Sequence, residues 1–275
     1  MLVSEHLCSG VGPLLYEISE TKSTLISLWL NHYDFIFGFL FMKKSRFLKE
    51  VFMKRSILDD GFQAYLTKDA TLVGDAGIPL LMDLKNTQIP NGMIPFGKAR
   101  TCSNHRQYVH FYSHDKTFSA VLTSTTKYLD LLKQYDGVIS PDCSILVNQA
   151  RCLQQTNTYM NRAVGFYLQK QGIPVIPNVR WGDETTFDFC FLGIPQNSIV
   201  CISTHGCLRT KRLREIFKAG LPVMLDVLNP TTVLVHGFMP DDVFGDYLDR
   251  SRFVRYASEF EQTHSEGGDE DGARI

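Results

Sequence analysis

The sequence predicts an α/β protein with a mostly parallel sheet and crossover helices, arranged as a barrel-like or incomplete (β/α) barrel. Its strand patterns are continuous apolar runs rather than alternating apolar and polar residues, which is typical of parallel strands covered on both faces. Helical patterns separate these runs along the chain. About six strands are recognisable, two fewer than a full eight-stranded barrel requires. An open doubly wound sheet is the alternative arrangement.

Strands and helices alternate from residue 108 onward, after two short strands or extended segments. Strands or short extended segments are expected at 77–82, 92–96, 108–112, 137–140, 173–179, 198–204 and 231–235. Apolar residues at helical spacing predict helices at 118–135, 148–171 and 209–228. Gly172 is placed to end the second helix in a left-handed conformation, and Gly220 and Pro222 are expected to break the third. The strand residues expected to be nearly inaccessible to solvent are Val175, Ile176, Val200, Ile202, Val233 and Leu234.

Composition divides the chain into three parts. Residues 1–52 are interpreted as a poorly ordered or spurious N-terminal extension, because normal globular character begins at Met53. Its apolar segment 24–42 has the length of a membrane span, but Asp34 near the middle costs about 2.5–3.5 kcal/mol on insertion scales, so a membrane anchor is the minority interpretation. Residues 53–256 form a single α/β domain without a membrane segment, and residues 257–275 are expected to be a disordered acidic tail.

Charge and motif content exclude several function classes. The 44% apolar and 21% charged fractions are globular values, and a net charge of −1 gives no support for nucleic-acid binding, although local basic runs leave it open. Seven irregularly spaced cysteines predict neither zinc sites nor a disulfide framework and suit reduced thiols in the cytoplasm. Neither of the common phosphate-loop motifs occurs, so no cofactor and no metal are predicted.

Polar residues follow four of the predicted strands at their C-terminal ends. Loops at these ends share one crevice in parallel α/β proteins. The candidate catalytic carboxylates are Asp142, Asp183 and Glu184, and the candidate ligand-binding residues are Arg180, Trp181, Asp188, Ser203, Thr204, His205 and His236. Structural roles compete with these assignments, because an Asp such as Asp142 is favoured in turns, a Trp covers cores and a strand-end His is often simply buried.

Two classes of function remain open at this stage. The first is a hydrolase or glycosidase-like enzyme on a sugar, nucleoside or nucleotide, with Asp142 and either Asp183 or Glu184 as acid and base. Helix N-termini at the same edge favour an anionic ligand. The second is a non-catalytic module that binds a host or phage protein or a nucleic acid. Convergence of the carboxylates in one pocket favours the enzyme, and separated carboxylates favour the module.

The strand-end motifs resemble a family of bacterial, phage and mobile-element proteins described only as a domain of unknown function. The resemblance covers about residues 75 to 240 and rests on 137–144, on 161–165, on 173–181, on 187–194 and on 200–206, with 94–96 and 109–111 upstream. It implies a phage or mobile-element context and a cytoplasmic site of action, and it implies no reaction. Cys143 replaces an expected aromatic residue and His205 an expected small aliphatic one, which argues against a family-wide catalytic role for His205.

Overall fold

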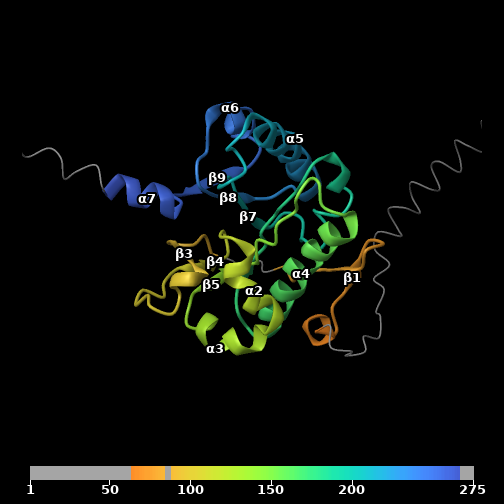
Figure 1. Cartoon of the computed structure of the whole chain (residues 1–275), viewed down its shortest axis with the longest axis vertical. Helices are drawn as coiled ribbons and strands as arrows, with labels where there is room; N and C mark the ends of the chain where they lie inside the picture. Colours follow the sequence, from red (N-terminus) through yellow and green to blue (C-terminus); the bar gives the residue numbers. More distant parts are fainter. Residues whose placement is uncertain (1–62, 84–87, 267–275) are drawn as a thin grey trace, which may run out of the picture. The chain divides into compact units, whose positions relative to one another are not determined.

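Parallel strands that pair in sequence order form the framework of this protein (Figure 1). The computed structural model describes residues 63–83 and 88–266, within the second of the two units, Met1–Val51 and Phe52–Ile275, into which the chain divides. The strands are β1 (Leu72–Val73), β2 (Ile78–Pro79), β3 (Met93–Pro95), β4 (Tyr108–His110), β5 (Gly137–Ile139), β6 (Val175–Ile176), β7 (Ile199–Ser203), β8 (Thr232–His236) and β9 (Arg252–Tyr256). The α-helices are α2 (Asp115–Thr123), α3 (Leu129–Leu132), α4 (Arg151–Lys170), α5 (Lys211–Leu228), α6 (Asp241–Phe244) and α7 (Glu259–Glu266).

The strand order is that of a (β/α) barrel that stays open. A four-stranded parallel sheet runs β3-β4-β5-β6, and a three-stranded one runs β7-β8-β9. A parallel bridge between Asn178 and Cys201 links the two sheets. No ladder joins β9 to β3 in the part of the chain that the structure describes, so no closed barrel forms. The predicted α/β class, with parallel strands and crossover helices, is confirmed.

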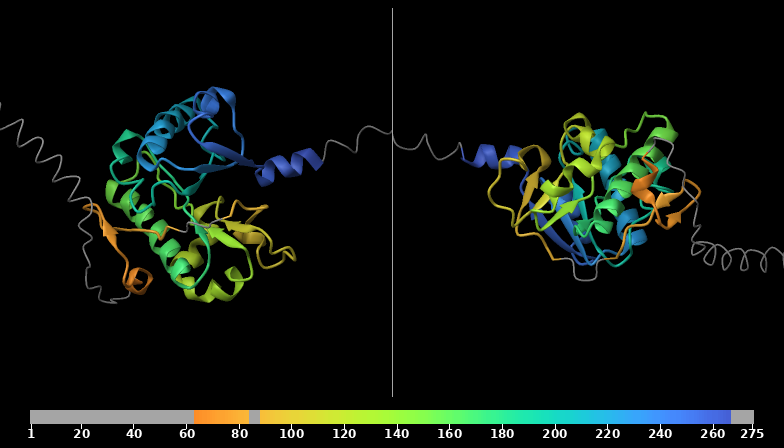
Figure 2. Two further views of the ribbon diagram at one scale, coloured as in Figure 1. Left: turned by 180° about the vertical axis from the view of Figure 1, so that it is seen from behind. Right: turned by 90° about the horizontal axis from the view of Figure 1, so that it is seen from below.

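Alternate strand residues face two different layers. On the outer face, α5 and α6 pack against β7 and β8, and α2, α3 and α4 pack against β4, β5 and β6 (Figures 1 and 2). On the inner face, side chains from the seven strands β3 to β9 meet in one small cluster that includes Ile139, Ile176, Cys201 and Leu234. The six core positions expected from the sequence are all at most 2% exposed, which confirms them.

Helix α5 differs from the prediction of a broken helix. It runs unbroken through Gly220 and Pro222, from Lys211 to Leu228. Gly220 serves packing instead of a break, because a Cβ there would lie 2.2 Å from the indole Nε1 of Trp181. The expected end of the preceding long helix is correct, since Gly172 has φ 81° just beyond α4.

The C-terminal part of the domain contains elements that the sequence did not predict, namely α6, β9 and α7. Strand β9 completes the second sheet, and α7 follows it inside the segment expected to be a disordered tail from residue 257. Residues 1–62 and 267–275 lie outside the described residues, and with them the whole of the expected N-terminal extension (1–52) and the rest of the tail. Within the described ranges, no helix combines the length and apolarity that a bilayer crossing requires.

Candidate functional site

A layer of polar side chains lies at the C-terminal ends of the strands, next to the inner apolar cluster of Ile139, Ile176, Cys201 and Leu234. Side chains two residues apart on a strand share a face. Asn178 therefore continues the face of Ile176, Ser203 that of Cys201 and His236 that of Leu234. The register sets Ser203 opposite His236, and His236 opposite Tyr256. The predicted gathering of strand-end residues at one edge is thus a consequence of parallel pairing.

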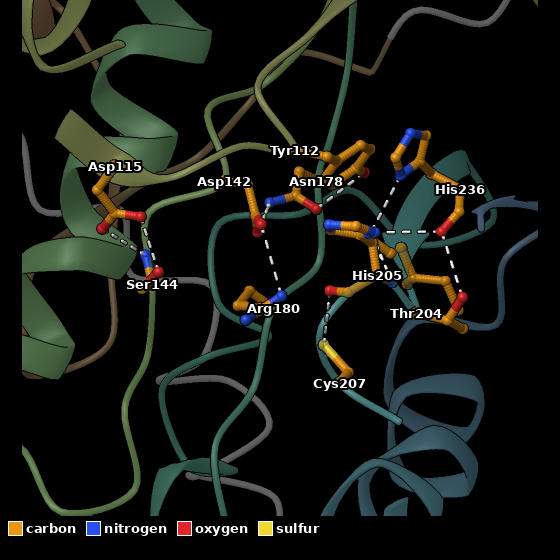
Figure 3. Close-up of polar contacts among 12 residues, drawn as sticks. Tyr112, Asp115, Asp142, Ser144, Asn178, Arg180, Thr204, His205, Cys207 and His236 are labelled. Carbon is orange, nitrogen blue, oxygen red and sulfur yellow. Dashed lines mark hydrogen bonds and ion pairs between the residues drawn. The ribbon is translucent and has the colours of Figure 1, made fainter. Parts of the chain in front are cut away.

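One half of the layer is a chain of hydrogen bonds that ends on an arginine (Figure 3). The Tyr112 hydroxyl donates to Asn178 Oδ1 at 3.1 Å, and Asn178 Nδ2 donates to Asp142 Oδ1 at 2.9 Å. Arg180 Nη1 approaches Asp142 Oδ2 at 3.5 Å, with the Asp142 side chain 10% and the Arg180 side chain 23% exposed. The Asp142 carboxylate raises the pKa of Arg180 further, and the guanidinium is permanently charged.

Helix α4 fixes the two strand ends that carry this chain. Asn161 Nδ2 donates to the carbonyl oxygen of Pro141 at 2.7 Å, and Arg162 Nη1 donates to that of Asn178 at 3.0 Å. Ser140 Oγ donates to Asn161 Oδ1 at 2.8 Å and accepts from the Asn178 backbone N–H, also at 2.8 Å. Hydrogen bonds from α4 and from Ser140 therefore fix the backbone next to Asp142 and Asn178, which limits the directions in which these two side chains point.

The other half of the layer is a stack of buried rings. The His236 ring lies 4.6 Å, centroid to centroid, from the rings of both His110 and Tyr112. Burial first, and then the neighbouring histidines His236 and His205, hold the pKa of His110 well below its usual range. Burial and the charge of His205 lower the pKa of His236 to about 4, while Glu261 opposes that shift. Both buried imidazoles are neutral at pH 7.

The loop after β7 presents His205 to solvent beside these rings. Ser203 Oγ lies 3.2 Å from His236 Nδ1 and accepts a hydrogen bond from the His205 backbone N–H, also at 3.2 Å. Thr204 Oγ1 donates to the carbonyl oxygen of Phe238 at 2.6 Å. This last contact depends on Gly237, which has φ 104° and where a Cβ would stand 2.7 Å from Thr204 Oγ1. His205 is thus an exposed imidazole on a backbone anchored at three points.

These residues combine a cation, a fixed carboxylate and a proton carrier. Cys207 follows the same loop, and its thiol faces Arg180; burial raises the pKa of that thiol despite the nearby cation. A neutral thiol leaves Asp142 as the charged partner of Arg180. A guanidinium binds carboxylate or phosphate oxygens in a fork, and an imidazole ring carries one nitrogen that can donate and one that can accept a proton. The arrangement suits binding of an anion beside a group that transfers a proton.

Several predicted site residues belong to this cluster and others lie elsewhere. Asp142, Arg180, Ser203, Thr204, His205 and His236 come together as described. Trp181 is 7% exposed and lies in the outer core, with its ring centroid 4.9 Å from that of Phe217. The candidate second carboxylates are not beside Asp142. Asp183 caps a short 3-10 helix (Glu184–Thr186), Glu184 is exposed in its first turn, and exposed Asp188 pairs with Arg151.

Asp183 instead borders an open surface groove of about 670 Å³ on the N-terminal half of α5. The groove is lined by Val147, Asp183, Lys211, Arg212, Glu215 and Ile216. This groove and the strand-end cluster have no lining residue in common. The carboxylates therefore do not converge in one pocket, which counts against the two-carboxylate enzyme expected from the sequence and, by that criterion, favours the binding module.

Sequence reasoning missed five residues of the site, one of which is Cys207, interpreted with the other cysteines as an ordinary reduced thiol. Tyr112, Asn178 and His110 were not chosen as ligand-binding residues, because each sits in or beside an apolar strand pattern that reads as core. Glu261 was missed because it lay in the expected disordered tail. Polar residues two positions beyond a buried strand residue are the signal that would have found Asn178. Among the described residues, no group of three or more His, Cys, Asp or Glu side chains is arranged to hold a metal ion.

Comparison with known proteins agrees with the resemblance seen in the motifs. The chain is 35% identical over 156 residues to the Gene 1 protein of Mycobacterium phage L5, a match that spans 54% of this chain and 68% of that protein. It is 33% identical over 158 residues to the Gene 1 protein of Mycobacterium phage D29, spanning 55% of this chain and 57% of that protein. No solved structure matches. The family model of a domain of unknown function, DUF4417, matches residues 70–257, and this chain belongs to that family.

Proposed function

We propose that this protein is an enzyme of hydrolase type that acts with a single carboxylate, Asp142, and binds a small sugar phosphate or nucleotide at the strand-end cluster. The observation that carries the proposal is the Tyr112–Asn178–Asp142–Arg180 chain. Burying charged and polar groups in this way costs stability unless every partner is in place. Such groups are characteristic of sites that hold charge ready for a ligand.

Each residue takes a role that its geometry allows. Arg180 binds the anionic group of the ligand. Its contact with Asp142 is weak, at 3.5 Å, so a ligand oxygen can take the place of the Asp142 carboxylate as the partner of the guanidinium. Asp142, oriented by Asn178, accepts a hydrogen bond from the attacking water or a substrate hydroxyl. His205 transfers the proton, because it is the exposed imidazole of the cluster. This scheme uses one carboxylate, in contrast to the paired carboxylates of most glycosidases.

Calorimetric titration tests the binding step. Ribose 5-phosphate and AMP are expected to bind the full chain, and Arg180→Met is expected to weaken both by at least about tenfold, the equivalent of one charge-assisted hydrogen bond. Arg151→Met is the matched control, because Arg151 is an exposed, ion-paired arginine on α4. Equal affinity of Arg180→Met and the unmodified protein would reject the site.

Turnover assays test the chemical step separately. His205→Asn and Asp142→Asn are expected to abolish hydrolysis of whichever ligand binds, with melting temperatures within a few degrees of the unmodified protein. Full activity in both variants would leave a binding site without the proposed chemistry.

We also propose that the protein acts in the cytoplasm, in a phage or mobile-element context. The six described free cysteines and the phage relatives support this.

A second candidate function is a non-catalytic module that contacts a host or phage protein or a nucleic acid. The open groove on α5 favours it, since exposed Lys211 and Arg212 border the groove and exposed Arg209 precedes them. Charge reversal of Lys211 and Arg212 to Glu is expected to abolish such binding and leave binding of AMP unchanged. Retention of a short single-stranded oligonucleotide on a filter, with and without these changes, distinguishes the two functions.

A further inference from the structure

An exposed phenylalanine stands on the rim of the strand-end cluster. Phe238 follows His236 and Gly237 at the end of β8 and is 60% exposed. Its carbonyl oxygen accepts the hydrogen bond from Thr204, the residue before His205. The backbone position of Phe238 is thereby fixed relative to the residues that the proposed function uses.

The ring of Phe238 has an ordered cation against it. The guanidinium carbon of Arg255 lies 5.5 Å from the ring centroid. Arg255 Nε also donates to the carbonyl oxygen of Gly237 at 3.0 Å, and Arg255 Nη2 pairs with Glu261. Glu261 is held in turn by the backbone N–H and the hydroxyl of Ser258, both at 2.9 Å. The cation behind the ring is therefore fixed by three contacts.

Isolated exposed apolar side chains are ordinary on protein surfaces and need no function. Phe238 differs from an isolated side chain in two respects. It is supported by a planar guanidinium whose own partners are in place, and it borders the site that contains Arg180, the arginine that we propose as the anion-binding group. Aromatic rings paired with arginine are the surfaces on which nucleobases stack.

We propose that Phe238 is a stacking platform for a nucleobase, so that the ligand of the strand-end cluster is a nucleotide with its phosphate at Arg180. This inference rests on the proposed function and narrows its substrate class. A sugar phosphate without a base would occupy only the Arg180 half of the site. The base contributes affinity through Phe238, and the phosphate contributes through Arg180.

Calorimetric titration of the full chain with AMP and with ribose 5-phosphate separates the two contributions. The unmodified protein is expected to bind AMP about tenfold more tightly than ribose 5-phosphate, a ratio typical of one stacked base. Phe238→Leu is expected to bring AMP down to the affinity of ribose 5-phosphate without changing the latter. Phe238→Tyr should keep the ratio, because the ring face remains. Leu248→Ala is the control, as Leu248 is another apolar residue, 54% exposed.

The outcomes distinguish a failure of the stacking platform from a failure of the proposed function. If AMP and ribose 5-phosphate bind the unmodified protein equally, or if Phe238→Leu keeps the tenfold ratio, the stacking platform is refuted while the anion site stands. If Phe238→Tyr loses the ratio as Phe238→Leu does, stacking is likewise refuted. If neither ligand binds the unmodified protein, the proposed function fails, and the stacking platform with it.

Discussion

The buried guanidinium of Arg162 organises the backbone around the candidate site. It is 1% exposed, and burial lowers its pKa to about 10, so it remains charged at pH 7. Its hydrogen bonds in the described part of the chain go to the carbonyl oxygens of Asn178, Cys190 and Leu192 and to the side chain of Asn161. One side chain thus connects α4 to the end of β6 and to the loop after it.

Arg162→Met is expected to destabilise the fold by about 3–5 kcal/mol. The reason is that several buried oxygens would lose their donor, and each unsatisfied buried group costs about 1–3 kcal/mol. Urea denaturation followed by circular dichroism measures the loss. The matched control is Arg250→Met, which removes an exposed ion pair with Asp226 worth at most about 1 kcal/mol. A similar, small loss in both variants would mean that Arg162 contributes no more to the free energy of unfolding than a surface arginine does.

At the residue scale, the sequence predicted the members of the site that stand directly after strands. Asp142, Arg180 and His205 are polar residues that interrupt an apolar run, and position alone identified them. Trp181 follows the same rule and yet lies in the core, because its burial depends on the gap left by Gly220 in a distant helix. Tyr112 was not found for a related reason, since its hydroxyl role depends on a partner 66 residues away.

Helix α5 shows how an element can be misjudged from its breaker residues. Gly and Pro two positions apart normally end a helix. Here the apolar face of α5 packs on β7 and β8 through Phe217, Leu221 and Leu225, and this burial outweighs the local cost of Pro222. Gly220 lies on the same face, against the indole of Trp181. Tertiary packing therefore decided the element, which local propensity could not predict.

Gly220→Ala is expected to destabilise the protein by about 1–3 kcal/mol, the range for overpacking, although alanine is the better helix former by about 1 kcal/mol. The added Cβ would stand 2.2 Å from Trp181 Nε1, so the indole must move. Tryptophan fluorescence and thermal melting measure both effects. Gly245→Ala serves as the control, because nothing lies within 4 Å of a Cβ at that position. Stabilisation by Gly220→Ala would contradict the packing argument.

Helix α7 begins with a reciprocal pair of hydrogen bonds between Ser258 and Glu261. The acidic composition of this segment had predicted disorder instead. The Glu261 carboxylate accepts from the Ser258 backbone N–H at 2.9 Å, and the Glu261 backbone N–H donates to Ser258 Oγ at 3.4 Å. Tyr256, at the end of β9, donates its hydroxyl to the carbonyl oxygen of Pro90 at 2.6 Å, across the open side of the barrel. The acidic composition suggested disorder, but specific pairing outweighs it in this stretch.

Glu261→Ala is expected to cost about 1–2 kcal/mol, because the α7 cap is lost and Arg255 loses its carboxylate. Hydrogen exchange of the amides in 256–262 is expected to rise in the same variant. Glu259→Ala is the control; its side chain is 41% exposed in an ion pair with Lys98, a kind of contact that contributes little. Equal protection of these amides in both variants would show that Glu261 does not hold the helix start.

Across the whole molecule, the parallel class and the neighbours of each strand followed from sequence order and apolar runs. The sequence did not predict how far the barrel closes, because closure depends on whether β9 pairs with β3 on the open side of the barrel, and these two strands lie far apart in the sequence. On that side Ile89 and Tyr256 pack on the inner cluster in place of a further ladder. The polar layer at one end of the strands also emerges only at this scale. Seven strands contribute to the framework, and the register between them decides which side chains meet.

The two buried imidazoles of this layer give the molecule a defined dependence of stability on pH. In the unfolded chain a histidine has a pKa of about 6.5. Burial lowers the pKa of His110 well below that value and that of His236 to about 4. Between these values the unfolded state binds more protons than the folded state, so the free energy of unfolding falls as the pH falls. The stability that the neutral rings confer is fully present above about pH 6.5.

The free energy of unfolding is therefore expected to decrease from pH 6.5 toward pH 4.5, by up to about 1.4 kcal/mol per pH unit for each of the two histidines. Urea denaturation at intervals between pH 4.5 and 8 measures this slope. Glu261, which faces His236, has a lowered pKa because hydrogen bonds from Ser258 and the charge of Arg255 outweigh the opposing effect of burial, so its contribution is lost only at lower pH. His236→Asn keeps a side-chain amide near Ser203 and is expected to remove about half of the slope, whereas His114→Asn, at an exposed position, should leave it unchanged. A slope that is absent in the unmodified protein, or equally steep in His236→Asn, would show that these rings are protonated in the folded state at the same pH as in the unfolded chain.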